Sequence, residues 1–242
     1  MPVTGTARLP PGVRIYAVGD VHGRFDLIAA LGLLIDAHRL GHPPARVIEV
    51  YLGDLIDRGP ASADVIAHLL HRRGTRDVVT LAGNHELMMM RALVEPETFP
   101  DWLASGGRET LLSYGIPIAR STGSDLDWGA MAEAVRQRIP AEHLALCRHL
   151  VTSFALGDYF FAHAGVRPGQ PLDQQLTEDL AWIRRPFLAS QADFGAVVVH
   201  GHTPVVRPEV HSNRINIDTG AYATGHLTCL VLEGAEIDFL QT

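Results

Sequence analysis

The chain has 242 residues, an apolar fraction of 47% and a formal net charge of −7 at pH 7. This length fits one large domain or two small ones, and the acidic balance without a long basic run argues against nucleic acid as a partner. Because we find neither a signal peptide nor a run of ~20 apolar residues, we expect a cytoplasmic protein with no membrane partner.

The first part of the chain alternates short apolar runs with helix-like stretches. The runs Val13–Val18, Val47–Leu52 and Val78–Ala82 are rich in β-branched side chains, which is typical of buried strands. Between them, Phe25–Leu40 and Ala61–Leu70 place apolar residues at intervals of three and four, as helices do. This strand–helix order predicts parallel strands in an α/β sheet.

The stretch Glu86–Leu150 is different, because it is helix-rich and has no strong strand pattern. We expect it to be a helical insertion, broken at Trp102–Gly107, that walls one side of the functional site. Strands then return, and the last two flank Gly234-Ala235 as a closing hairpin. We expect these strands at Val151–Leu156, Tyr159–Ala162, Ala196–Val199, Arg214–Ile217, Leu227–Glu233 and Glu236–Leu240. Without a repeat or linker, residues 1–242 should form a single domain.

Five short clusters pair an Asp, Asn or His with an adjacent glycine, just after the expected strands. They are Gly19-Asp20-Val21-His22-Gly23, Gly53-Asp54-Leu55-Ile56-Asp57-Arg58-Gly59, Gly83-Asn84-His85-Glu86, His163-Ala164-Gly165 and Gly201-His202-Thr203. In α/β sheets, ligands bind beyond the carboxyl ends of the strands. The clusters should therefore converge on one edge and form one site.

These side chains suit a pair of divalent metal ions. Oxygen and imidazole ligands fit Mn, Fe or Zn, and no thiol is among them. Asp20 and His22 are two residues apart and can reach one ion from extended backbone, whereas the carboxylate of Asp54 can bridge two ions. The other ligand candidates are Asn84, His163 and His202. Two metals ~3.5–4 Å apart would use all of these ligands, an arrangement that serves phosphoryl chemistry.

Three residues in the clusters are candidates for catalysis. His85 follows Asn84, so its imidazole should face the substrate, where it could give or take a proton. Asp57 could orient that imidazole, and the planar guanidinium of Arg58 suits phosphate oxygens. Singly, each fragment could be a turn or a surface ion pair, but their joint order favours a site. The roles of His200, Tyr222 and His226 stay open, although His200 could form a ligand pair with His202.

At these residues the chain resembles the phosphoprotein phosphatase family, within the calcineurin-like metallophosphoesterases. The signatures Gly-Asp-x-His-Gly, Gly-Asp-x-x-Asp-Arg-Gly and Gly-Asn-His-Glu occur unsubstituted and in order, and Trp182–Arg184 and Asp218–Ala221 look most like the bacterial and phage branch. The resemblance runs from about Tyr16 to Glu233. It implies a four-layer αββα sandwich of two mixed β-sheets, with the metal site at the carboxyl ends of the strands.

The resemblance also implies roles for the site residues. The first metal would be held by Asp20, His22 and Asp54, and the second by Asp54, Asn84, His163 and His202. The groups acting on substrate would be His85 as general acid, Asp57 behind it, and Arg58 and Arg184 on the phosphate. Two Mn²⁺ ions would be the usual cofactors, with Fe or Zn as alternatives, and a hydroxide bridging them would attack phosphorus.

Three functions compete. The first is hydrolysis of phosphoserine or phosphothreonine, with phosphotyrosine as a further possibility, in a phosphoprotein or phosphopeptide. The second is hydrolysis of a dinucleoside polyphosphate such as diadenosine tetraphosphate, but members of that branch often lack the second Asp of Gly-Asp-x-x-Asp-Arg-Gly and carry Asp in place of Glu86. Because this chain keeps Asp57 and Glu86, we expect the phosphomonoesterase. The third, an inactive binding module, would require a lost ligand, and none is lost.

Overall fold

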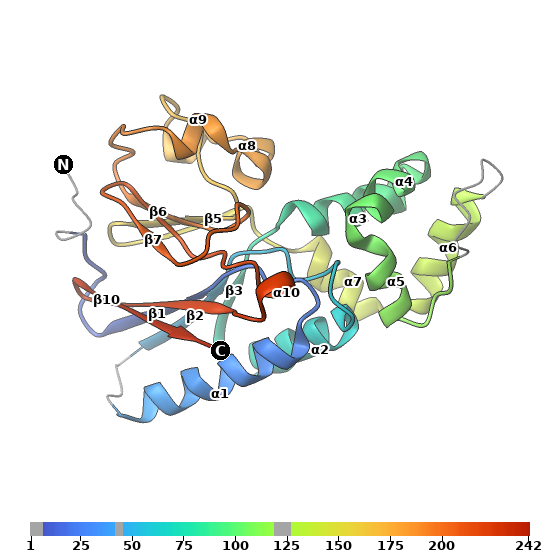
Figure 1. Cartoon of the computed structure of the whole chain (residues 1–242), viewed down its shortest axis with the longest axis horizontal. Helices are drawn as coiled ribbons and strands as arrows, with labels where there is room; N and C mark the ends of the chain where they lie inside the picture. The colour runs from blue at the N-terminus through green and yellow to red at the C-terminus, as the bar shows by residue number, and fades with distance from the viewer. Residues whose placement is uncertain (1–6, 42–45, 119–126) are drawn as a thin grey trace.

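The computed structural model describes residues 7–41, 46–118 and 127–242. Two mixed five-stranded β-sheets pack face to face, and helices cover their outer faces (Figure 1). The first sheet has the order β10–β9–β1–β2–β3 and the second β4–β5–β6–β8–β7. The predicted four-layer αββα sandwich is therefore confirmed.

The first sheet is built from both ends of the chain. Its strands are β1 (Val13–Val18), β2 (Arg46–Tyr51), β3 (Asp77–Thr80), β9 (Thr228–Glu233) and β10 (Glu236–Gln241). The first three are parallel, as predicted, and the last two form the predicted antiparallel hairpin. Helices α1 (Phe25–Gly41) and α2 (Ser62–Arg73) connect the parallel strands. In the described ranges no helix has the length and apolar character needed to cross a bilayer.

The second sheet follows the helical insertion in the chain. Its strands are β4 (Ser153–Leu156), β5 (Tyr159–Ala162), β6 (Val197–His200), β7 (Glu209–Val210) and β8 (Arg214–Asn216). Strand β4 begins two residues later than predicted, because Val151 instead makes an isolated parallel bridge with Leu81. The short helices α8 (Thr177–Trp182) and α9 (Arg185–Leu188), which cover this sheet, were not predicted from the sequence.

Strand β1 shows why its last four residues, Ile15 to Val18, are all apolar. Ile15 and Ala17 point into the core between the two sheets, whereas Tyr16 and Val18 point toward the helices of the first sheet. Successive side chains of a strand lie on opposite faces, and both faces are covered here. The carboxyl ends of such strands are therefore the places where polar side chains can meet.

The helical insertion lies beside the sandwich (Figure 1). Its helices are α3 (Asn84–Val94), α4 (Phe99–Trp102), α5 (Arg108–Ser113), α6 (Trp128–Arg138) and α7 (Ala141–Arg148). The predicted break is a π-helical turn at Leu103–Gly107, where Gly106 has φ 114°. A Cβ at Gly106 would lie 2.8 Å from Arg58, so only glycine allows this close approach. Residues 119–126 of the predicted helical stretch lie outside the described residues.

Candidate metal centre and active site

The five predicted clusters meet at the carboxyl ends of strands from both sheets. Asp20, Asp54 and Asn84 follow β1, β2 and β3, while His163 and His202 follow β5 and β6. Segments far apart in sequence are in direct contact here, because the backbone N–H of His202 donates to the Asp20 carboxylate at 3.1 Å. The predicted convergence on one edge is confirmed.

The backbone at this edge adopts an unusual conformation. Every non-glycine residue with positive φ in the described ranges belongs to the predicted site, namely His22, Asp54, Asp57, Arg58 and His202. Their φ values lie between 46° and 72°. Left-handed backbone is costly for residues with a Cβ, and it persists where the surrounding structure enforces it. The tight turns after the strands thus aim these side chains into the site.

Two buried clusters of ligand-type side chains share Asp54. In one cluster, Asp54 lies with His22 and His85, and in the other it lies with His163 and His202. The ligand atoms within each cluster are all within 4.8 Å of one another. Asp54 Oδ2 is 3.5 Å from His22 Nε2, and Oδ1 is 3.4 Å from His163 Nε2. One carboxylate between two imidazole groups is the geometry that a dinuclear metal site requires.

The remaining ligand candidates lie at the rim of these clusters. The Asn84 side-chain oxygen is 3.1 Å from His163 Nε2, consistent with the predicted grouping of this pair. The Asp20 carboxylate makes its hydrogen bonds with the backbone of His202, and Asp20 belongs to neither cluster. His85 also lies close to His22, with its Nε2 3.8 Å from Asp54 Oδ2.

Hydrogen bonds fix which imidazole nitrogen faces the centre. Nδ1 of His22 lies 3.0 Å from the Ile56 carbonyl oxygen, and Nδ1 of His163 lies 2.9 Å from that of Leu52. A carbonyl oxygen only accepts, so both Nδ1 atoms carry a proton and both Nε2 atoms face the centre. In His202, Nε2 is buried and has no hydrogen-bond partner among the described residues. Imidazole nitrogens oriented in this way fit divalent metal ions.

Burial and charge set the protonation of the centre. Burial lowers the pKa values of His22 and His202 to about 3, which keeps both imidazoles neutral. Although burial opposes it, the carboxylates of Asp54 and Asp20 raise the pKa of His163 to about 10. Burial also disfavours the ionised form of Asp54, but the surrounding histidines hold the pKa of Asp54 well below its usual value. The ionised carboxylate of Asp54 therefore lies beside a charged His163 and two neutral imidazoles.

His85 and Asp57 form a buried pair. Nδ1 of His85 is 2.7 Å from Asp57 Oδ2, as expected for a carboxylate that orients an imidazole. The helical insertion supplies two further donors to the same carboxylate, Trp102 Nε1 at 2.9 Å and Thr110 Oγ1 at 2.6 Å. Burial alone would lower the pKa of His85, but the nearby carboxylates of Asp54 and Asp57 raise it. Sequence analysis missed Trp102 and Thr110, because nothing local to them indicates this contact.

Glu86 supports the loop that carries Asp54. Its Oε2 accepts the backbone N–H groups of Gly83 at 2.9 Å and Asp54 at 3.0 Å. Its Oε1 accepts those of Leu55 at 2.8 Å and Ile56 at 3.2 Å. The role of Glu86 is therefore to position the shared carboxylate, and it makes no contact that would select one phosphate ester over another.

A cleft of about 550 Å³ opens above this centre. Its walls include Arg58, His85, Met88, Trp182 and Tyr222, together with the π-helical turn of the insertion. Met88 and the π-helical turn belong to the helical insertion, which therefore lines one side of the cleft. The guanidinium of Arg58 donates to His22 Nε2 at 3.0 Å and lies 4.8 Å above the ring of Tyr222.

Other candidates have contrasting environments. Arg184 is exposed, and its charge contributes to the lowered pKa of His202, but it is not among the residues that line the cleft. His200 is fully buried beside Phe187, and His226 hydrogen-bonds the last residue of the chain, so neither lines the cleft. Sequence analysis assigned no role to Asp218, a buried carboxylate whose pKa is raised by burial to about 6. It follows β8 and precedes Gly220 by two residues, which is close to the pattern of the other clusters.

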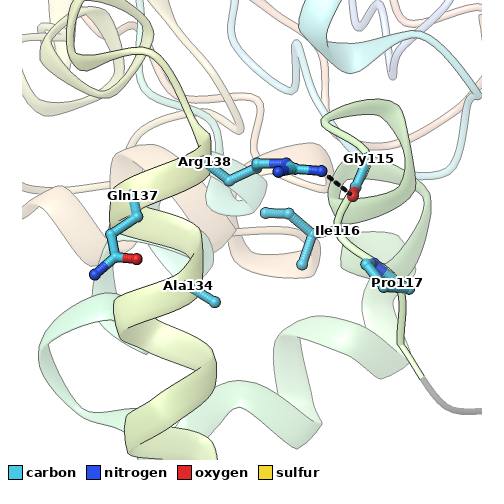
Figure 2. Close-up of a pocket in the computed structure, with 6 residues that line it drawn as sticks. All are labelled: Gly115, Ile116, Pro117, Ala134, Gln137 and Arg138. Carbon is cyan, nitrogen blue, oxygen red and sulfur yellow. Dashed lines mark hydrogen bonds between the residues drawn. The ribbon is translucent and has the colours of Figure 1, made fainter.

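A second cavity, of about 440 Å³, lies within the helical insertion (Figure 2). Ala134, Gln137 and Arg138 of α6 face Gly115–Pro117 across it, and Arg138 donates to the Gly115 carbonyl oxygen at 3.3 Å. None of the residues lining it belongs to the ligand clusters. We assign it no part in the chemistry.

Known proteins share both the sequence pattern and the fold. Residues 13–228 match the family model of calcineurin-like phosphoesterases. An asymmetrical bis(5′-nucleosyl)-tetraphosphatase PrpE from Halalkalibacterium halodurans is 29% identical, with 92% of this chain and 91% of that protein covered. Serine/threonine-protein phosphatase 1 from Salmonella typhimurium is 30% identical, with 88% and 89% covered. A crystal structure of a putative diadenosine tetraphosphatase superposes with a TM-score of 0.66, at 20% identity, over 97% of this chain and 98% of that one.

Proposed function

Because the chain belongs to the calcineurin-like phosphoesterase family, we propose that it hydrolyses dinucleoside tetraphosphates at its histidine–carboxylate centre. The observation that carries this proposal is the match to tetraphosphatase PrpE from Halalkalibacterium halodurans, which spans about nine-tenths of both chains. This reverses our preference from the sequence. Asp57 and Glu86 favoured a phosphomonoesterase there, but in the structure Asp57 holds His85 and Glu86 holds a loop. Neither contact distinguishes the two substrates.

The residues of the site support metal-dependent hydrolysis. We propose Mn²⁺ as the ion, held by Asp20, His22, Asp54, Asn84, His163 and His202. Two such ions would supply charge neutralisation at the phosphate oxygens and a water of lowered pKa. Arg58 and Arg184 would bind the remaining phosphate oxygens of the polyphosphate chain. His85, oriented by Asp57, would donate a proton to the departing oxygen.

Hydrolysis of phosphoproteins is the second candidate. It is favoured by the likeness to the Salmonella serine/threonine phosphatase over almost nine-tenths of both chains. The same centre serves both reactions, since each breaks a phosphorus–oxygen bond with water.

A direct comparison of substrates tests the proposal. With Mn²⁺ added, we expect kcat/KM for diadenosine tetraphosphate to exceed that for phosphoserine and phosphothreonine peptides, with AMP and ATP as products. The Asp54→Asn variant, purified in parallel, controls for contaminating hydrolases. A higher kcat/KM for any of the peptides would assign the chain to the phosphoprotein phosphatases instead.

A further inference from the structure

Trp182 stands apart from the other two tryptophans of the chain. Trp102 is fully buried, and Trp128 stacks on Phe99 with a centroid distance of 5.9 Å and an interplanar angle of 8°. Trp182, the last residue of α8, is 39% exposed and lines the cleft above the metal centre. Among the described residues its side chain has no hydrogen bond and no aromatic ring contact. The indole is therefore held by neither kind of interaction and remains partly open to the cleft.

One face of the other aromatic ring in the cleft is covered. Arg58 lies 4.8 Å from the centroid of the Tyr222 ring, and this ring meets His22 at nearly a right angle. Tyr222 is as exposed as Trp182, but the indole of Trp182 has no such contact among the described residues. Exposed aromatic rings at a binding site are the usual partners of flat, aromatic ligand groups.

The backbone places a cation next to this ring. Ile183 has extended dihedral angles and is buried, while Trp182 and Arg184 on either side of it are exposed. The exposed guanidinium of Arg184 thus lies two residues after the indole that lines the cleft. An aromatic ring with a cation nearby in the chain suits a ligand with both a ring and a phosphate.

We propose that Trp182 is the stacking platform for the nucleobase of the nucleotide whose phosphate lies at the metal centre. This specificity role rests on the proposed nucleotide hydrolysis. Stacking recognises the flat face that every nucleobase has, so Trp182 selects nucleotides over bare phosphate chains without distinguishing one base from another. It would act on substrate affinity, because the indole does not contact the groups that would transfer protons.

Competition by two ligands of equal chain length tests this role. In excess Mn²⁺, adenosine 5′-tetraphosphate and inorganic tetraphosphate are compared as competitive inhibitors of p-nitrophenyl phosphate hydrolysis. We expect the wild-type protein to bind the adenosine compound about 5- to 150-fold more tightly, as base stacking implies. Trp182→Ala should remove this preference and leave the inhibition constant of inorganic tetraphosphate unchanged, whereas Trp182→Phe should retain part of it. Leu176→Ala, at an exposed apolar residue at the start of the same helix, is the matched control and should behave as wild type.

The outcomes separate this inference from the proposed function. No preference for the adenosine compound in the wild-type protein, or an unchanged preference in Trp182→Ala, would overturn the stacking role. Equal weakening of both inhibitors in Trp182→Ala would also overturn it, because the ring would then only support the shape of the cleft. Failure to hydrolyse diadenosine tetraphosphate, with the base preference intact, would instead refute the substrate while leaving the stacking role in place.

Discussion

Replacing Glu86 by glutamine tests how the shared carboxylate of Asp54 is positioned. The Glu86 carboxylate is 1% exposed and accepts four backbone N–H groups, two on each oxygen, from Gly83, Asp54, Leu55 and Ile56. Glutamine has the same shape, but one of its two acceptors becomes a donor. Two of the four N–H groups would then face an NH₂ group and lose their partner.

The magnitude follows from this count. A buried donor left without a partner costs about 1–3 kcal/mol, so two of them predict a loss of about 2–6 kcal/mol in the free energy of unfolding. Domains of this kind are stable by about 5–15 kcal/mol in total, so the effect should be large. Because three of the donors belong to the loop after β2, the position of Asp54 should change as well, and Mn²⁺ should bind more weakly.

The assay is urea unfolding and Mn²⁺ titration of Glu86→Gln. Burial and the Asp54 carboxylate raise the pKa of Glu86 to about 7, and the comparison is therefore made at pH 8 with Mn²⁺ present. Glu95→Gln is the control, because Glu95 is 46% exposed and its surface ion pair with Arg91 should contribute little to stability. If Glu86→Gln unfolded at the same urea concentration as the wild-type protein and bound Mn²⁺ normally, Glu86 would not be the residue that positions the loop of Asp54.

Three further substitutions probe the centre. Asp54→Asn weakens both clusters, so it should reduce the metal content from two ions per chain. It should lower metal affinity by more than the about 10- to 100-fold that is typical when a residue hydrogen-bonded to a ligand is replaced. A retained content of two ions would refute the shared role of Asp54. His85→Asn should lose about 10²–10⁴-fold in kcat on phosphoserine peptides and less on diadenosine tetraphosphate, whose phosphate leaving group needs little protonation. Equal losses, or loss of bound metal, would contradict the acid role. Burial lowers the pKa of His200 to about 3, so between pH 6.5 and 3 the unfolded chain binds more protons and stability falls as the pH drops. The free energy of unfolding of the metal-free protein, measured with urea, should fall between pH 7 and pH 4.5. His200→Gln should make this fall smaller by about 3 kcal/mol. An unchanged pH dependence would count against a buried neutral imidazole.

The parts of the site that follow strands were predictable from the sequence. The apolar runs before Asp20, Asp54 and Asn84 mark buried parallel strands, and such strands end together at one edge of a sheet. The histidines at 163 and 202 follow the same pattern in the second sheet. The local pattern of apolar runs and glycines is therefore enough to predict that five distant segments meet.

Contacts made through tertiary packing were not predictable in this way. Trp102 and Thr110 reach Asp57 because the helical insertion folds back onto the loop after β2, and their own neighbours in sequence show no such contact. The hydrogen bonds of Glu86 likewise depend on how two loops pack. The motif was visible in the sequence, but it suggested substrate preference where the structure shows support of a loop.

The left-handed backbone of the site has a consequence for how such a protein can evolve. Five side chains that serve the centre are held at positive φ, and each adds about 1–2 kcal/mol to the cost of the folded state. Glycine or asparagine at these positions would relieve that cost and remove the ligands. A duplicated gene released from selection for catalysis should therefore drift toward a product that is more stable and inactive. Selection for activity should therefore keep the protein less stable than variants of the same fold that carry glycine or asparagine at these positions.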